Sequence, residues 1–128
     1  MARYLLDTGL VIRHLRGERR IVRLLRGIGK RERLTISSIT RIEVLAGMHP
    51  EERYQTRKLL SRFLNYDVTK EIADRTGDLL SEYRQRGQAI ALPDTIIAAT
   101  ALQQQLTLIT LNPKDYPFQG LSLYPLPE

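Results

Sequence analysis

Four acidic residues have the type and spacing that metal-assisted chemistry requires. In chain order they are Asp7, Glu43, Asp94 and Asp115. Two carboxylates about 5 Å apart repel by roughly 3 kcal/mol at an effective dielectric constant of ~20, so several cannot stay ionised together without a cation or shared protons. The chain has no Cys and only two His, so we expect oxygen ligands, which favour Mg²⁺ or Mn²⁺. Because two such ions activate water and stabilise the leaving oxygen of a phosphodiester, convergence of the four acids would predict a nuclease.

Each of these acids also has a purely structural explanation. Asp7 is a favoured residue for capping the helix that follows it. The pattern Thr40-x-x-Glu43 matches a capping box. Asp94 in the first turn of a helix would interact favourably with the helix dipole, and Asp115 lies in a sequence typical of a turn. The acids indicate chemistry only if the fold brings them together.

The hydrophobic pattern predicts the elements that would position them. Apolar runs predict strands at 4–6, 34–36, 66–68, 106–109 and 121–124, and helical periodicity predicts helices at 9–15, 18–28, 39–46, 51–64, 70–85 and 93–102. Strands alternating with helices indicate an α/β fold around a mainly parallel sheet, in one domain spanning 1–128. Ligands bind such sheets at the carboxyl ends of the strands. This rule favours Asp7 and Asp115 directly, whereas helices must bring in Glu43 and Asp94.

Positive charge is concentrated near the N-terminus. Residues 1–33 contain ten basic and three acidic residues, within a chain of formal charge +6. The predicted helix at 18–28 is apolar on one side and basic on the other, which is typical either of a solvated surface or of a surface that binds RNA phosphates. The candidate RNA-binding residues are Arg13, Arg16, Arg19, Arg23, Arg26 and Lys30.

No part of the sequence favours a membrane partner. The longest uncharged stretch, at 95–113, contains three Gln and four Thr, which is unlike a membrane span of ~20 apolar residues. The apolar run before Asp7 is too short for a signal peptide. We expect a cytoplasmic protein.

Four segments together resemble one known family. They lie at 5–8, 36–47, 93–101 and 110–116, and they are similar to the motifs of PIN-domain proteins, more narrowly the VapC-type toxins of toxin–antitoxin pairs. The resemblance implies a three-layer α/β/α sandwich with four to five strands. It also implies a Mg²⁺- or Mn²⁺-dependent endoribonuclease that acts as a type II toxin, binds a cognate antitoxin and forms a homodimer.

The resemblance also assigns roles to individual residues. Asp7, Glu43 and Asp94 match the three acids of the family's metal centre, and Thr8 matches a hydroxyl that binds a metal-coordinated water or a phosphate. In this interpretation Asp7 and Asp94 hold the principal metal. Glu43 and a fourth acid complete its shell or hold a second ion.

The fourth acidic position has two candidates. Asp115 is favoured as the ionised group and Asn112 as its polar neighbour, but family members also place an acid at the position of Asn112. Other classes fit less well: a phosphatase with Asp7 as nucleophile would need a second Asp where the chain has Gly9. The main alternative is a catalytically silent PIN-fold module that binds RNA or a protein partner.

Overall fold

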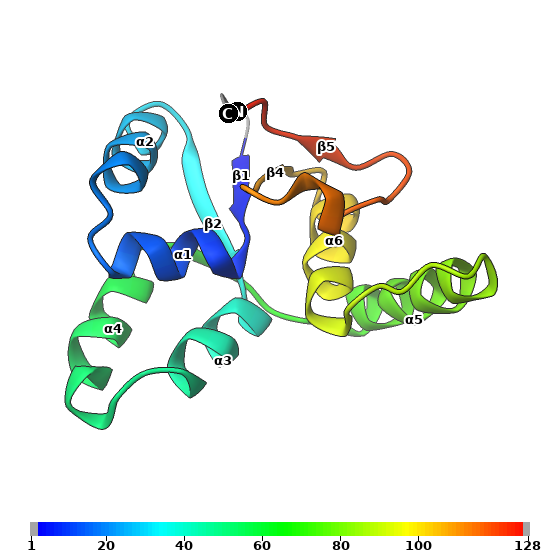
Figure 1. Ribbon diagram of the computed structural model, residues 1–128, viewed down its shortest axis with the longest axis horizontal. Coiled ribbons are helices and arrows are strands. Elements are labelled where there is room, and N and C mark those ends of the chain that lie inside the picture. Colours follow the sequence, from blue (N-terminus) through cyan, green and yellow to red (C-terminus); the bar gives the residue numbers. More distant parts are fainter. Residues whose placement is uncertain (1–2, 127–128) are drawn as a thin grey trace.

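Within residues 3–126, the sheet has five strands, all parallel to their neighbours. The computed structural model describes residues 3–126. The strands are β1 (Arg3–Leu6), β2 (Arg33–Ser37), β3 (Leu64–Tyr66), β4 (Thr107–Ile109) and β5 (Ser122–Leu123). Their order across the sheet is β3-β2-β1-β4-β5, so β1 is central and its carboxyl end lies between those of β2 and β4 (Figure 1).

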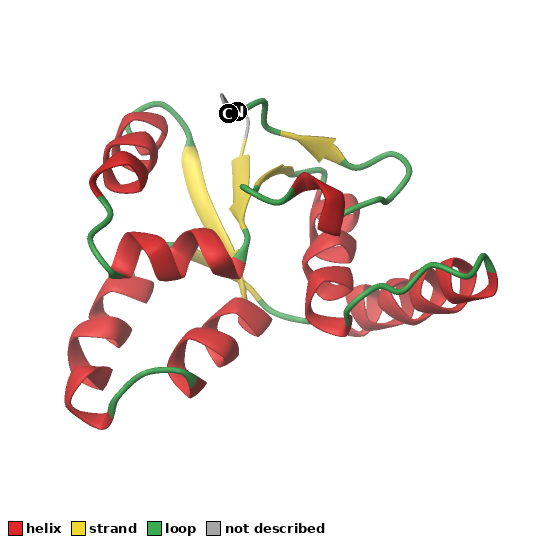
Figure 2. Ribbon diagram, viewed as in Figure 1, coloured by secondary structure: helices red, strands yellow, loops and turns green. Residues whose placement is uncertain are grey.

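Helices cover both faces of this sheet (Figure 2). The first core contains side chains from α1 (Thr8–Leu15), α2 (Arg19–Gly29), α3 (Ser38–Ala46) and α4 (Arg53–Leu60). The second contains side chains from α5 (Lys70–Gln85) and α6 (Leu92–Gln104). Successive strand residues point to opposite faces, so Leu6 belongs to the first core and Leu5 to the second. This arrangement confirms the predicted three-layer α/β/α sandwich.

Local sequence signals set the helix boundaries near the site. Asp7 caps α1, and Ser37 caps α3 by accepting a hydrogen bond from the Ile39 N–H. Pro93 lies in the first turn of α6, where its missing N–H costs nothing. The predicted helix at 70–85 is confirmed as α5, which begins after its Thr69 cap.

The segment between α3 and α5 differs from the prediction. A single helix at 51–64 was expected, but a short 3-10 turn, η1 (Pro50–Glu52), precedes α4, and α4 ends at Leu60. Phe63 and Leu64 continue the helical spacing of apolar residues, yet Leu64 pairs with Thr35 in the sheet. Strand β3 therefore lies two residues earlier than the predicted strand at 66–68.

The structural alternative for Glu43 is wrong. The Thr40-x-x-Glu43 capping box does not form, because Ser37 is the cap and Thr40 lies inside α3. On α3, the side chain of Ile42 is 61% exposed. Among the described residues, none of the helices is both long and apolar enough to cross a membrane.

Candidate active site

Asp7 lies in the centre of the site, directly after β1. Its side chain is 5% exposed. The Leu10 N–H donates to Oδ1 at 2.9 Å, and the Thr110 hydroxyl donates to Oδ2. Burial raises the pKa of Asp7 above its usual value, although both hydrogen bonds oppose this, and the negative charge of Asp115 raises it further. Asp7 is therefore both the cap of α1 and a buried carboxylate whose two oxygens are held in place.

The hydroxyl of Thr8 links α1 to Glu43 on α3. Thr8 Oγ1 lies 2.7 Å from Glu43 Oε1 and 3.0 Å from Thr40 Oγ1. A Thr hydroxyl has one proton, so it donates to one of these two oxygens at a time. Glu43 is half-buried and Thr40 is fully buried. This contact holds Glu43 beside the carboxyl end of β1.

Asp94 reaches the same region from the first turn of α6. The Tyr116 hydroxyl donates to its Oδ1 at 3.4 Å. Burial raises the pKa of Asp94, and the charges of Asp115, Glu43 and Asp7 also raise it, against the effect of the Tyr116 hydrogen bond. The helix dipole alone does not account for this environment, because three other acids act on the same carboxylate.

The fourth acid is on the short 3-10 turn η2 (Pro113–Asp115), which follows β4. Asp115 is exposed, and its charge raises the pKa of both Asp7 and Asp94. Asn112 is also exposed, and it contributes through its backbone, whose N–H donates to Thr110 Oγ1 at 3.0 Å. The structure thus brings the charge of Asp115 to the cluster and gives Asn112 a contact that supports Thr110.

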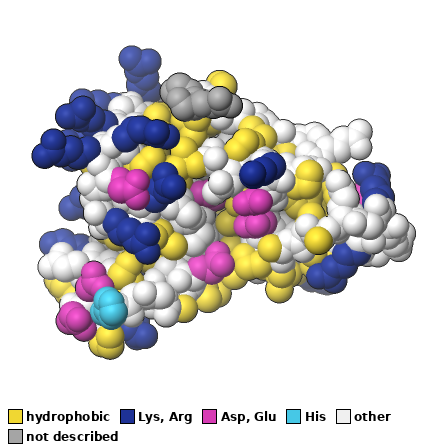
Figure 3. Space-filling view, in the orientation of Figure 1, with side chains coloured by type: hydrophobic (Ala, Val, Ile, Leu, Met, Phe, Trp, Pro, Cys, Tyr) yellow, Lys and Arg dark blue, Asp and Glu magenta, His cyan; other side chains and the backbone are white. Residues whose placement is uncertain are grey.

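The four acids share one region of the molecule although they come from four elements. Figure 3 shows acidic side chains in the middle of this face, near the ends of α1, α3 and α6 seen in Figure 1. Within residues 3–126, no three His, Asp or Glu side chains are arranged to ligate one ion. Mg²⁺ commonly keeps several waters and uses only one or two protein carboxylates. The donor chemistry and the mutual repulsion of the acids therefore fit a divalent cation, whereas a complete preformed ligand shell is not part of the fold.

The basic candidates fall into two groups. Arg13 lies close enough to Asp7 for its charge to lower the pKa of that acid, and Arg16 lines the hollow next to Glu43. Four others are exposed on or just after α2, where Figure 3 shows Lys and Arg side chains gathered at the upper left: Arg19, Arg23, Arg26 and Lys30. Of these six residues, Arg13 in α1 and Arg16 directly after it are the two placed beside the acids.

Three supporting residues were not predicted from the sequence. Thr40, Thr110 and Tyr116 each place a hydroxyl against the cluster. Thr110 and Tyr116 flank the acid-bearing turn in the sequence, which was the one available signal. Burial also raises the pKa of Tyr116 far above its usual value, and the neighbouring acids add to this, so its hydroxyl remains a hydrogen-bond donor.

Comparisons with known proteins agree with this geometry. The PIN domain family model matches residues 4–117. The chain is similar to ribonuclease VapC10 of Mycobacterium tuberculosis, with 38% identity over 113 residues, covering 88% of this chain and 85% of the relative. It is also similar to ribonuclease VapC19 of the same organism, with 34% identity over 88% of this chain and 91% of the relative.

Solved structures share the fold along nearly the whole chain. VapBC2 from Rickettsia felis, bound to a promoter DNA fragment, matches with a TM-score of 0.82 and 26% identity, covering 95% of this chain and 97% of the other. A toxin–antitoxin complex from Klebsiella pneumoniae matches with a TM-score of 0.75 and 32% identity, covering 95% and 96%. The chain therefore belongs to the PIN-domain family, in its VapC-type ribonuclease branch.

Proposed function

We propose that this protein is a Mg²⁺- or Mn²⁺-dependent endoribonuclease and the toxin component of a type II toxin–antitoxin pair. The observation that carries the proposal is the cluster of Asp7, Glu43, Asp94 and Asp115, in which burial and then the charges of neighbouring acids raise the pKa of Asp7 and Asp94. A protein gains nothing in stability from such repulsion, so the arrangement fits a bound cation. The relatives named ribonucleases VapC10 and VapC19 support RNA as the substrate.

Within this proposal, Asp7 and Asp94 hold the principal ion. Glu43 and Asp115 complete its shell or hold a second ion, with Asn112 as the polar neighbour of Asp115. When bound, Mg²⁺ or Mn²⁺ supplies activation of water and stabilisation of negative charge on the phosphodiester oxygens. The chain itself supplies no Cys, and no His lies in the cluster.

The surrounding residues orient the acids. Thr110 and the Leu10 N–H fix the two oxygens of Asp7, each of which keeps a lone pair for a further partner. Thr8 orients Glu43 and Tyr116 orients Asp94. Supporting contacts of this kind commonly change metal affinity or activity by about 10–100-fold when they are removed.

The exposed cations near the N-terminus are proposed to bind the phosphates of the RNA. Arg13 and Arg16 lie beside the acids, and the α2 residues Arg19, Arg23 and Arg26, followed by Lys30, extend the positive surface. Each phosphate contact releases counterions, so RNA affinity is expected to fall as salt is raised.

We further propose an antitoxin partner, a homodimer and a cytoplasmic location. The matched structure from Klebsiella pneumoniae is a toxin–antitoxin complex, which supports an antitoxin for this chain. Ile42 on α3 and Leu92 on α6 are 61% and 51% exposed, and their helices pack together. Large exposed apolar side chains on two helices in contact fit a surface that another chain covers.

The test is cleavage of total cellular RNA by the purified protein in Mg²⁺, Mn²⁺ or EDTA. Asp94→Asn removes one charge of the cluster, and Asp78→Asn, on the exposed surface of α5, is the matched control. We expect discrete fragments that require metal, persist in Asp78→Asn and are lost in Asp94→Asn. Equal cleavage by both variants would contradict the proposal, and absence of cleavage by the wild-type protein would favour the silent binding module.

A further inference from the structure

A groove of about 510 Å³ opens directly beside the carboxylate cluster. One side is formed by Arg13 of α1 and Arg20 of α2, and the other by residues after β4 and around β5, including Leu111, Leu123 and Tyr124. Arg20 was not among the RNA-binding residues predicted from the sequence. The groove connects the positive surface to the acids.

Thr110 is shared by the groove and the acidic cluster. Thr110 lines the groove, and its hydroxyl donates a hydrogen bond to Asp7 Oδ2. Arg13, on the other wall, lies close enough to lower the pKa of Asp7, which burial raises. A phosphate held at Asp7 would therefore lie next to the part of the groove that Thr110 lines.

The charges that line the groove suit an anion. Arg13 and Arg20 are both exposed, and neither Asp nor Glu is among the described residues that line it. Arg13 lies 3.8 Å from Glu18, a long contact between two half-exposed side chains. Such pairs are weak, and the guanidinium has five N–H donors, so most of its donors remain free for phosphate oxygens.

The opposite wall carries apolar side chains beside Thr110 and Asn112, and Tyr124 in it is held in place. The Tyr124 N–H donates to the Leu108 carbonyl at 2.8 Å, and the Tyr124 ring meets the Tyr4 ring edge-on with centroids 5.3 Å apart. Leu111 and Leu123 continue this wall. Unpaired bases contact apolar and aromatic side chains in this way, whereas the bases of a duplex are stacked and inaccessible.

From this combination we infer that the groove binds the single-stranded RNA segment adjoining the cleaved phosphodiester. Arg13 and Arg20 contact its phosphates, and the wall of Leu111, Leu123 and Tyr124 contacts a base. The inference rests on the proposed ribonuclease function and adds to it the residues that hold the RNA beside the acids and the direction in which the RNA leaves them.

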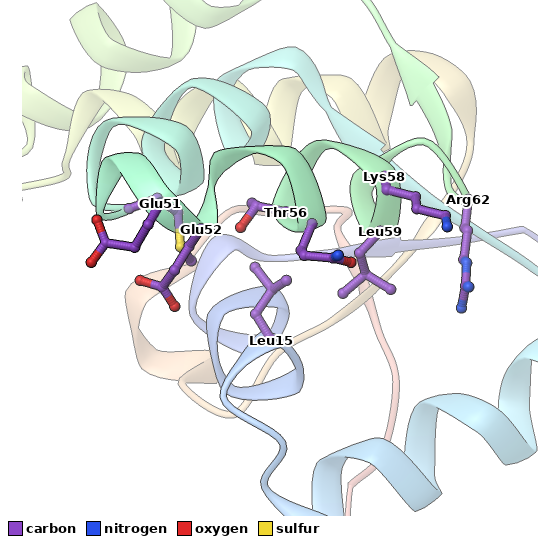
Figure 4. A pocket seen from close by; sticks show the side chains of 9 residues that line it. Leu15, Glu51, Glu52, Thr56, Lys58, Leu59 and Arg62 are labelled. Atoms are coloured by element: carbon purple, nitrogen blue, oxygen red, sulfur yellow. The ribbon is translucent and has the colours of Figure 1, made fainter.

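A second pocket, of about 450 Å³ between α1 and α4, provides the contrast. Figure 4 shows that Glu51 and Glu52 lie at one end of it and Lys58 and Arg62 at the other, with Leu15 and Leu59 between them. Its acids would repel a phosphate backbone. Its mixed charges are suited to a protein segment rather than to RNA.

The test measures binding of a short, fluorescein-labelled single-stranded RNA of mixed sequence by anisotropy, in EDTA and over a range of KCl concentrations. We expect Arg20→Ala to weaken binding roughly tenfold at low salt and to reduce the slope of log affinity against log salt by about 0.7, the value for one phosphate contact. Arg84→Ala, which removes an exposed cation from α5, should leave the slope unchanged. Equal slopes for the two variants would overturn the inference.

A crosslinking measurement locates the RNA independently. RNA containing 4-thiouridine is irradiated with the wild-type protein in EDTA, and crosslinked peptides are identified by mass spectrometry. We expect crosslinks within residues 111–126. Crosslinks confined to the pocket between α1 and α4 would overturn the inference and leave the groove to a protein partner. Because neither measurement requires cleavage, failure of the proposed nuclease activity would be seen separately.

Discussion

The acidic cluster and the basic surface of α2 are built in opposite ways. The acids come from the end of β1, from α3, from α6 and from η2, and the contact between Asp7 and Thr110 joins residues 103 positions apart. The α2 cations follow one another on one helix at 19–29. The first site depends on the whole topology, whereas the second depends on a single amphipathic pattern.

Burial separates the two regions further. Asp7 is 5% exposed and has a hydrogen bond to each oxygen, whereas Arg19, Arg23 and Arg26 are exposed. Interactions in a buried, connected site are strong and non-additive, but exposed charges act weakly and almost independently. Single substitutions should therefore disable the acidic cluster and only weaken the basic surface.

The largest effect is expected for Asp7→Asn. Asn also caps helices well, so α1 should remain folded, but the charge at the centre of the cluster is lost. We expect the cleavage rate in Mg²⁺ to fall by more than about 100-fold, since loss of a metal ligand should exceed the loss of a supporting contact. Normal activity with an unchanged circular dichroism spectrum would mean that Asp7 is only a helix cap.

A smaller loss is expected for Thr110→Val, which keeps the shape of the side chain and removes the hydroxyl that donates to Asp7. Asp7 would keep its Leu10 hydrogen bond but lose the orientation of Oδ2. We expect cleavage to fall by about 10–100-fold. Thr107→Val on the same strand, whose hydroxyl faces Ser122, should retain near wild-type rates, and similar losses in both variants would point to general damage to β4.

The repulsion within the cluster should be visible in stability. The pKa of Asp94 is raised in the folded state, so its ionisation destabilises the fold as pH rises through that pKa. In EDTA at neutral pH, Asp94→Asn should therefore melt a few degrees higher than the wild-type protein. The difference should vanish at acidic pH, where Asp94 is protonated in both states. A lower melting temperature for Asp94→Asn at neutral pH would argue against repulsion.

The smallest effect is expected on α2. Arg23→Ala removes one exposed cation among several, so RNA affinity at moderate salt should change less than about threefold, in line with the small contribution of a single exposed charge. Replacing Arg19, Arg23, Arg26 and Lys30 together should instead reduce the salt slope by up to about 3. Anisotropy titrations with single-stranded RNA measure both variants. If Arg23→Ala alone weakened RNA binding as much as the fourfold replacement, Arg23 would be a dominant contact and the prediction would be wrong.

Much of this molecule could be predicted from local patterns. The alternation of apolar strands with helices predicted an α/β fold around a mainly parallel sheet, and α5 begins and ends where the sequence indicates. The three layers were implied by the family resemblance. The structure of the 51–68 segment could not be predicted correctly. The spacing of Phe63 and Leu64 fits the apolar face of a longer helix, but it also fits a turn followed by a buried strand. Only pairing of Leu64 with Thr35, a long-range contact, decides between them.

The functional site, too, could be predicted only in part from local sequence patterns. Asp7, Glu43, Asp94 and Asp115 could be selected because the motifs around them together resemble those of one family. The roles of three other residues could not be predicted, because a hydroxyl or a surface arginine carries no local signal of its role: these are Thr110, Tyr116 and Arg20. Their positions become informative only once β4 lies beside β1 and the segment around β5 faces α2.

The most direct test of the central claim is calorimetric titration of Mn²⁺ into wild-type protein, Asp94→Asn and Asp78→Asn at neutral pH. If the four acids form one cation site, the wild type and Asp78→Asn bind alike, Asp94→Asn binds at least about tenfold more weakly, and acidification weakens binding because protons compete for the same carboxylates. Equal Mn²⁺ affinity in all three proteins would contradict the account.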